Sequence, residues 1–212
     1  MNVRQLVIGD KNLSSWSLRP WLALTVAGID FAEVNVRLGR PETKAAILRH
    51  SPSGKVPCLI DGRTLVWDSL AICEYAAELA PALWPADAAA RAEARAVSAE
   101  MHSGFTALRQ NMPMEVCASR PGEGRTPEVE ADVARILAIW EACRARHGAG
   151  GPFLFGAFSI ADAMYAPVVW RFTTYAVAVP PVVRAWMDAM LALPAMQAWR
   201  AGAAAELVAR PA

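Results

Sequence analysis

The sequence predicts two domains of different fold class: an α/β domain over residues 1–80 and an all-helical domain over residues 87–212, with a linker at residues 81–86. Two observations lead to this division. In the first part, short apolar or alternating runs lie between turn residues, which is typical of strands. In the second part, apolar residues recur every three or four positions, which is typical of helices packed on one face.

The first domain is predicted to follow the order βαβαββα. Strands are expected at residues 3–8, 32–36, 56–60 and 64–67, and helices at residues 17–27, 41–50 and 69–79. Gly28 ends the first helix, and Asp61 and Gly62 form a hairpin turn because this pair tolerates the positive φ of a tight turn. This order predicts an α/β unit with a small mixed sheet.

The second domain is predicted to contain only helices, at residues 88–111, 126–147, 160–174, 182–193 and 195–207. Thr126, with proline and glutamate behind it, is a good helix start. Ser159 and Asp162 have the spacing of a capping box. The first two helices each carry an apolar stripe that we expect to be buried: Val97, Met101, Phe105, Leu108 and Met112 in one, and Val129, Val133, Ile136 and Trp140 in the other.

Composition narrows the class of protein. The chain has 212 residues, of which 55% are hydrophobic, and a net charge of +1, so it is globular and has no electrostatic preference for nucleic acid or a membrane surface. No apolar run approaches the ~20 residues that span a bilayer, and the start of the chain lacks the apolar stretch of a signal peptide. We therefore expect a cytoplasmic protein. Its four scattered cysteines fit reduced core thiols better than disulfides or a metal site.

The stretch SSWSLRP, residues 14–20, lies where a thioredoxin-like fold carries Cys-x-x-Cys, but serines, Ser14 and Ser17, stand at both ends of the spacing. A hydroxyl at a helix N-terminus can donate a hydrogen bond to a thiolate without becoming a nucleophile. The alternative is that these serines only cap the helix, with Ser17 well placed because Pro20 then falls in the first turn.

Two further stretches have features of a ligand site. In SPSGKVPCL, a cis peptide between Val56 and Pro57 would expose the Val56 backbone to an extended ligand, and Lys55 would hold a carboxylate. In VWDSL, Ser69 opens a helix and Asp68 lies next to it, so the pair suits a group with both an ammonium and a carboxylate. An ordinary proline turn, a solvated lysine and a helix cap explain each feature alone.

Together these stretches resemble the cytosolic glutathione S-transferases, and the likeness runs over most of the chain. SSWSLRPWLALTVAGIDF is similar to the zeta-class motif SSCxWRVRIALxLKGIDY without a gap, SPSGKVPCL resembles NPxxxVPxL, and DSLAICEYAAE resembles Q/E-S-x-A-I-x-E-Y-L. Trp16 replaces the cysteine of the zeta motif, and Pro20 with Trp21 replaces Val-Arg. No cysteine lies in residues 12–21, which disfavours disulfide exchange because an alcohol forms no mixed disulfide.

The resemblance implies a role for each matching residue. Ser14 would hydrogen-bond the glutathione sulfur and lower its pKa. Val56, next to the cis Pro57, would pair with the cysteinyl backbone. Asp68 and Ser69 would hold the γ-glutamyl end. Lys55 would lie toward the glycyl end.

The stretch EMHSGF, residues 100–105, resembles a stretch of the bacterial beta class in which the histidine approaches the cleft. His102 is therefore a candidate acceptor contact, although a lone helical histidine is more often packed or solvated. Phe105 and Arg109 are expected one and two turns along the same helix, lining an acceptor pocket.

The predicted function is attack of glutathione thiolate on a small electrophilic molecule, with no metal, and the resemblance implies a homodimer that contributes to detoxification. One alternative is a zeta-like cis-trans isomerase of maleylacetoacetate type, which consumes no glutathione. Another is a non-catalytic binding protein of the same fold. The sequence names neither the electrophile nor the oligomeric state.

Overall fold

A computed structural model describes residues 3–209 of the chain. Its sheet has four strands in the order β2-β1-β3-β4. The first pair is parallel, and β3 runs antiparallel to both β1 and β4. This mixed sheet confirms the predicted order βαβαββα. The strands are β1 (Arg4–Gly9), β2 (Phe31–Val36), β3 (Cys58–Asp61) and β4 (Thr64–Trp67).

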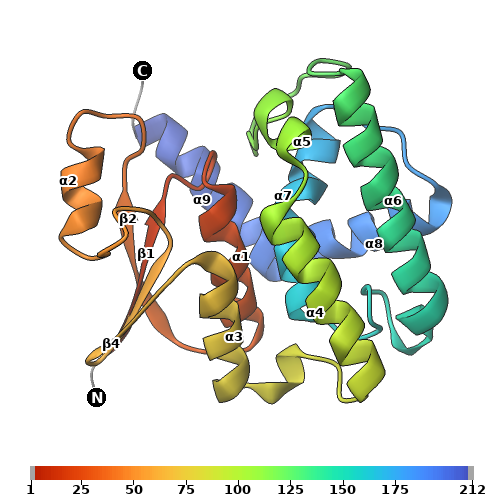
Figure 1. Cartoon of the computed structure of the whole chain (residues 1–212). Coiled ribbons are helices and arrows are strands. Elements are labelled where there is room, and N and C mark those ends of the chain that lie inside the picture. Colours follow the sequence, from red (N-terminus) through yellow and green to blue (C-terminus); the bar gives the residue numbers. More distant parts are fainter. Residues whose placement is uncertain (1–2, 210–212) are drawn as a thin grey trace.

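Helices cover both faces of this sheet, as Figure 1 shows: α2 lies on the outer face, and α1 and α3 lie between the sheet and the helical domain. Side chains of β1 alternate accordingly, because successive residues of a strand point to opposite faces. Leu6 and Ile8 join the large core with α1 and α3, whereas Val7 packs in a small cluster with Ile47 of α2. The three helices are α1 (Ser15–Val26), α2 (Thr43–Leu48) and α3 (Ser69–Leu79).

The rest of the described chain is helical except for its connecting loops; in Figure 1, α4 to α8 lie on the right, and α9 extends to the left behind α1. A 3₁₀ turn, η1 (Pro81–Leu83), lies in the predicted linker. None of the helices within residues 3–209 is long and apolar enough to cross a membrane. The α-helices are α4 (Ala88–Ser103), α5 (Thr106–Asn111), α6 (Pro127–His147), α7 (Ile160–Thr174), α8 (Pro181–Ala192) and α9 (Pro194–Ala209), and a second 3₁₀ turn is η2 (Gly148–Gly150).

The single helix predicted over residues 88–111 is wrong, because α4 ends at Ser103 and α5 begins at Thr106. Phe105 adopts a left-handed conformation with φ of 60°, which stops the helix. The Arg109 guanidinium donates to the Gly104 carbonyl at 2.9 Å and to the Met101 carbonyl, so the freed backbone groups have partners. The apolar stripe predicted across this break is nevertheless buried throughout.

Two local predictions also need correction. The first helix begins at Ser15, not at residue 17, and Ser14 is its N-cap, so Ser17 lies inside the helix. In the hairpin, Asp61 still pairs with Thr64, so the turn consists of Gly62 and Arg63; Gly62 carries the positive φ, 60°. The predicted caps at Thr126 and at Ser159 with Asp162 are confirmed.

Helix α9 binds the first strand-helix loop. The Trp199 indole donates to the Lys11 carbonyl at 2.9 Å, and the Lys11 amide donates to the Glu206 carboxylate at 2.8 Å. The same carboxylate also accepts from the Asn35 side chain. The last described helix therefore contacts the N-terminal domain directly, and Figure 1 shows it running past α1 toward the sheet.

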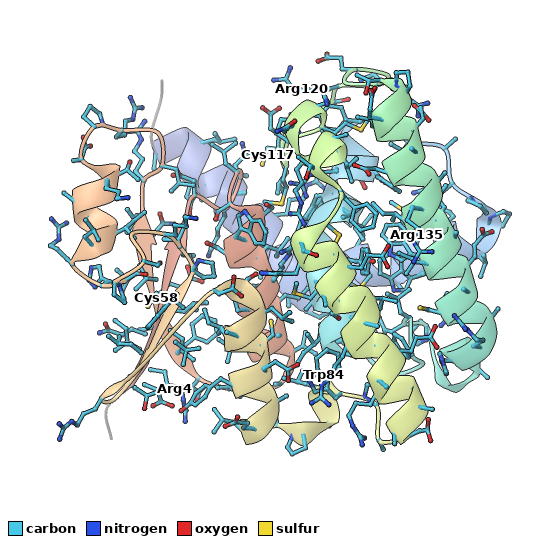
Figure 2. The ribbon with its side chains drawn as sticks, viewed as in Figure 1. Arg4, Cys58, Trp84, Cys117, Arg120 and Arg135 are labelled. Carbon is cyan, nitrogen blue, oxygen red and sulfur yellow. The ribbon has the colours of Figure 1, made fainter. Side chains whose placement is uncertain are left out.

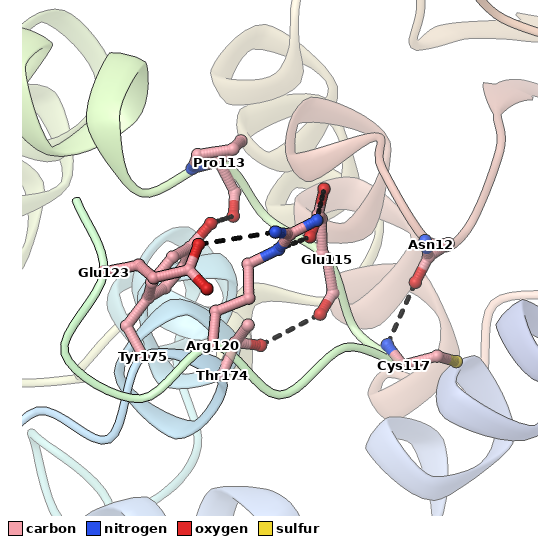
Figure 3. Close-up of polar contacts among 8 residues, drawn as sticks. All are labelled: Asn12, Pro113, Glu115, Cys117, Arg120, Glu123, Thr174 and Tyr175. Carbon is pink, nitrogen blue, oxygen red and sulfur yellow. Dashed lines mark hydrogen bonds and ion pairs between the residues drawn. The ribbon is translucent and has the colours of Figure 1, made fainter.

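The loop between α5 and α6 forms a second connection (Figure 3). The Cys117 amide donates to the Asn12 side chain at 3.0 Å, and the Thr174 hydroxyl donates to the Glu115 carbonyl at 2.9 Å. Cys117 is exposed on this loop, whereas Cys58 is buried in the sheet layer, and both positions are marked in Figure 2. All four cysteines are free thiols, and Cys117 departs from the expected core location.

Candidate active site

A pocket of about 570 Å³ lies where the N-terminal domain faces α4. It brings together six of the nine predicted site residues with three that sequence reasoning missed, Trp16, Ser53 and Trp67. The six are Lys55, Val56, Pro57, Asp68, Ser69 and His102. Within residues 3–209 no group of three metal-ligating side chains is close enough to hold a metal ion.

The wall formed by residues 55–57 precedes β3. The peptide between Val56 and Pro57 is cis, as predicted. β3 begins only at Cys58, so Val56 stands outside the strand ladder. Val56 is half-buried and Lys55 is exposed. Backbone polar groups of Val56 are thus positioned beside the pocket, where an extended ligand can pair with them.

The N-terminus of α3 forms the next wall. Asp68 caps the helix with a positive φ of 77°, and its Oδ1 accepts the amides of Leu70 and Ala71 at 2.9 and 3.3 Å. Ser69 is 1% exposed, and its hydroxyl has no hydrogen-bond partner among the residues that the structure describes. A buried hydroxyl without a partner is costly, so Ser69 is suited to receive a polar group of a ligand.

Ser14 caps α1 and is 5% exposed. Its hydroxyl donates to the Ser17 Oγ at 2.7 Å and accepts from the Ser17 amide at 3.4 Å. Ser17 Oγ also accepts from the Gly9 amide at 3.1 Å. Ser14 is not among the residues that line the pocket. Trp16, two residues further on in α1, does line it.

His102, at the end of α4, faces Asp68 across the pocket. Its Nε2 lies 3.3 Å from the Asp68 Oδ2, and its ring packs edge-on against Trp16 with centroids 5.4 Å apart. Burial lowers the pKa of His102, and this effect outweighs the attraction of Asp68, which acts in the opposite direction. His102 is therefore predominantly neutral at pH 7, and its contact with Asp68 is a contact between a neutral ring and a carboxylate.

This lowered pKa predicts a pH dependence of folding. The unfolded chain takes up a proton at His102 near the ordinary pKa, about 6.5, whereas the folded protein resists it, so stability falls as the pH drops from 6.5 through the folded pKa. Between pH 7 and pH 5.5, the urea midpoint of the wild type should fall further than that of His102→Gln. A smaller fall in the wild type would mean that the attraction of Asp68 dominates instead.

Phe105 and Arg109 do not occupy the predicted position. They belong to α5 and its cap, not to the helix of His102, and neither is among the lining residues of the pocket. Phe105 is 7% exposed and belongs to the core. Arg109 is partly buried, and its guanidinium lies 4.7 Å from the Trp16 ring centroid. It therefore reaches the site only through Trp16.

The comparisons with known proteins agree with this architecture. The model of the glutathione S-transferase N-terminal domain matches residues 13–79, and that of the C-terminal domain matches residues 123–202. A structure of a glutathione transferase homolog from Burkholderia gl BGR1, with bound glutathione, is 23% identical and covers 96% of this chain and 99% of that one, with a TM-score of 0.71.

Curated relatives match over shorter segments. A "probable maleylacetoacetate isomerase" of Caenorhabditis elegans is 36% identical over 97 residues, which are 45% of this chain and 45% of that protein. A zeta-class glutathione S-transferase of Euphorbia esula is 39% identical over 77 residues, 35% of this chain and 34% of that protein. The chain thus matches less than half the length of these relatives.

The fold defines a protein in which a thioredoxin-like domain and a helical domain meet, and residues of both line the pocket described above. Because the models of both domains match in order, the chain belongs to the glutathione S-transferase family.

Proposed function

We propose that the protein binds glutathione in the pocket beside Val56 and Ser69 and activates its thiol for attack on a small electrophile. The observation that carries this proposal is the pocket itself, which gathers all five residues expected to hold glutathione. In this arrangement the ligand backbone pairs with Val56, and its amino-acid end lies against Asp68 and the unpartnered Ser69 hydroxyl. Lys55, exposed at the rim, lies toward the glycyl carboxylate.

Ser14 is proposed to hold the sulfur as a thiolate. The Ser14 hydroxyl turns its proton from Ser17 to the sulfur, and the Ser17 hydroxyl then donates to Ser14 Oγ. Ser17 keeps the donation from the Gly9 amide, which lies 3.1 Å away. A chain of donors from Gly9 through Ser17 and Ser14 then points at the negative charge, and such chains strengthen each member. The thiol proton passes to solvent.

In the chemical step, the thiolate attacks the electrophilic carbon and forms a carbon–sulfur bond. With an activated aryl chloride, the carbon–chlorine bond breaks and chloride leaves with the electron pair. Activation is largely electrostatic, because the protein supplies fixed donors to the sulfur and no covalent intermediate.

A product analysis tests this function. The protein should be retained on immobilised glutathione, and with glutathione and an activated aryl chloride it should release one chloride for each thiol consumed. Wild-type protein without glutathione is the control. Retention without any turnover, over a panel of aryl chlorides and enones, would instead support a non-catalytic binding protein.

A second candidate is cis-trans isomerisation of a maleylacetoacetate-type substrate, which the name of the C. elegans relative favours. In that reaction the thiolate adds to the double bond, rotation follows, and elimination returns the thiol. The same assay separates the two functions, because isomerisation leaves the thiol concentration unchanged while the substrate disappears.

A further inference from the structure

Three arginines from three helices lie together where the two domains meet. Arg19 belongs to α1, Arg109 to α5 and Arg171 to α7. Arg19 is fully buried and Arg171 is 3% exposed. Burial lowers the pKa of Arg19 well below its ordinary range, and repulsion from Arg109 and Arg171 lowers it further. The cluster therefore places three guanidinium groups close together inside the protein, where each disfavours the charge of the others.

Partners for this charge are missing. None of the three side-chain nitrogens of Arg19 has a hydrogen-bond partner within the described part of the chain, and the same is true of Nη1 in both Arg109 and Arg171. The remaining bonds of Arg109 and Arg171 go to backbone carbonyls, such as Gly104 and Met112 at 2.9 Å each. Buried guanidinium groups are normally paired with carboxylates, because an isolated buried charge is strongly unfavourable.

The carboxylates that attract Arg19 and Arg109 are already engaged. Asp68 attracts Arg19, but its oxygens accept the amides that open α3 and lie against His102. Asp132 attracts Arg109, but its Oδ2 accepts the Leu108 amide at 2.9 Å. Neither forms an ion pair with an arginine of the cluster in residues 3–209. The cluster thus keeps unused donors and an excess of positive charge.

Trp16 covers these donors on the pocket side. The guanidinium carbons of Arg19 and Arg109 lie 4.4 and 4.7 Å from its ring centroid. Trp16 lines the pocket and is 37% exposed as a residue, so its ring separates the charges from the ligand space. An aromatic face attracts cations, but it accepts none of the directed hydrogen bonds that a guanidinium fork offers to a carboxylate.

We propose that Arg19 and Arg109 form an anion subsite beneath Trp16, and that the acceptor substrate of this protein carries a carboxylate that enters this subsite when the Trp16 ring turns aside. As an acceptor subsite this rests on the proposed function, whereas anion binding itself does not. The carboxylate takes no part in bond making: it positions the electrophilic carbon while the thiolate displaces the leaving group.

Benzoate is the probe for the subsite, with benzamide as its neutral isostere, in the absence of glutathione and at constant ionic strength. Benzoate should raise the unfolding temperature of the wild type in a saturable manner, because a ligand that binds only the folded state stabilises it. Benzamide should need a concentration at least about tenfold higher to give the same shift in unfolding temperature, because it lacks the charge. Equal shifts from the two compounds would overturn the proposal.

Variants locate the binding. In Arg19→Met the benzoate dissociation constant should rise about tenfold or more, since a charge-assisted bidentate contact is lost. Arg184→Met is the matched control, because Arg184 is exposed on α8 and its ion pair with Asp188 is long, at 4.0 Å. This variant should bind benzoate like the wild type. Trp16→Ala should bind benzoate more tightly, since no ring has to move. Unchanged binding in Arg19→Met overturns the site.

Turnover then tests the acceptor class. The acceptors are 4-chloro-3-nitrobenzoate and its amide. Each rate is divided by the rate at which glutathione reacts with the same acceptor in the absence of the protein. Wild type should prefer the carboxylate, and Arg19→Met should lose that preference while still turning over the amide. If benzoate binds but neither acceptor reacts, the anion site stands and the proposed function fails. If both acceptors react equally while benzoate binds, the acceptor role fails.

Discussion

Replacing Ser14 with alanine should lower kcat roughly 100-fold, the scale of losing one fixed donor to a developing or bound anion. The Kd for glutathione should change little, because Val56, Asp68 and Ser69 still hold the ligand. The variant should remain folded, since the hydroxyl contributes only one helix cap, worth about 1 kcal/mol. The measurement pairs steady-state turnover with a titration of the near-ultraviolet thiolate absorbance, whose midpoint should move to higher pH.

The two neighbouring serines supply the controls. Ser15→Ala should keep turnover close to the wild type. Ser17→Ala should lose an intermediate amount, because Ser17 contacts Ser14 Oγ at 2.7 Å and supports it without touching the sulfur. Full activity in Ser14→Ala together with a large loss in Ser15→Ala would mean that the Ser15 hydroxyl contacts the sulfur, and it would contradict the role proposed for Ser14.

Replacing Asp162 with asparagine should destabilise the protein by about 3 kcal/mol or more, since it removes acceptors from several buried donors. Asp162 is fully buried and accepts from four groups: the Leu154 and Ser159 amides, the Ser159 hydroxyl and the Trp186 indole, at 2.9 to 3.0 Å. Asparagine keeps one oxygen and turns an N–H donor toward two of these donors. For a chain of this length the Tm should fall by roughly 6–12 °C.

Asp188→Asn is the matched control, because Asp188 is exposed on α8 and its change should stay within about 0.5 kcal/mol. Burial raises the pKa of Asp162, although its four donors oppose the shift. A Tm for Asp162→Asn within about 2 °C of the wild type would show that this carboxyl is already protonated in the folded protein, because a protonated aspartate resembles asparagine.

Local chemistry made several elements predictable. The helix over residues 69–79 has the predicted ends because Asp68 caps it, and α6 begins at the proline that follows the Thr126 cap. The resemblance of SPSGKVPCL to a family motif implied the cis peptide before Pro57, and the structure confirms it. The two helix starts depend on residues within a few positions of one another, so a single chain is sufficient to detect them.

The break between α4 and α5 could not be predicted in this way. The apolar period continues through Phe105 without interruption, so periodicity favours one helix. What supports the break is Arg109, which donates to carbonyls at Gly104 and Met101, a contact that exists only after the turn has formed. The feature of the sequence that favoured a break here was Gly104, because glycine is unfavourable inside a helix.

The residues of the candidate site also fall into two groups: those that local sequence singled out and those that depend on tertiary packing. Residues 55–57 and the Asp68–Ser69 pair lie on the N-terminal domain, where local sequence singled them out and the family resemblance implied their role. The Trp16 wall and the arginines behind it depend on how α1 meets the helices of the other domain, which spacing along one helix does not specify. The signal for Arg19 was present in SSWSLRP as a charge between two apolar residues of an otherwise apolar helix.

The bond between Lys11 and Glu206 has a consequence for biosynthesis. Its two partners are 195 residues apart, so the N-terminal loop waits for its acceptor until almost all of the described chain has left the ribosome. The sheet can assemble early from nearby strands. The loop between β1 and Ser14, however, reaches its final contacts last. The nascent N-terminal domain is therefore expected to acquire a settled ligand site only after α9 docks.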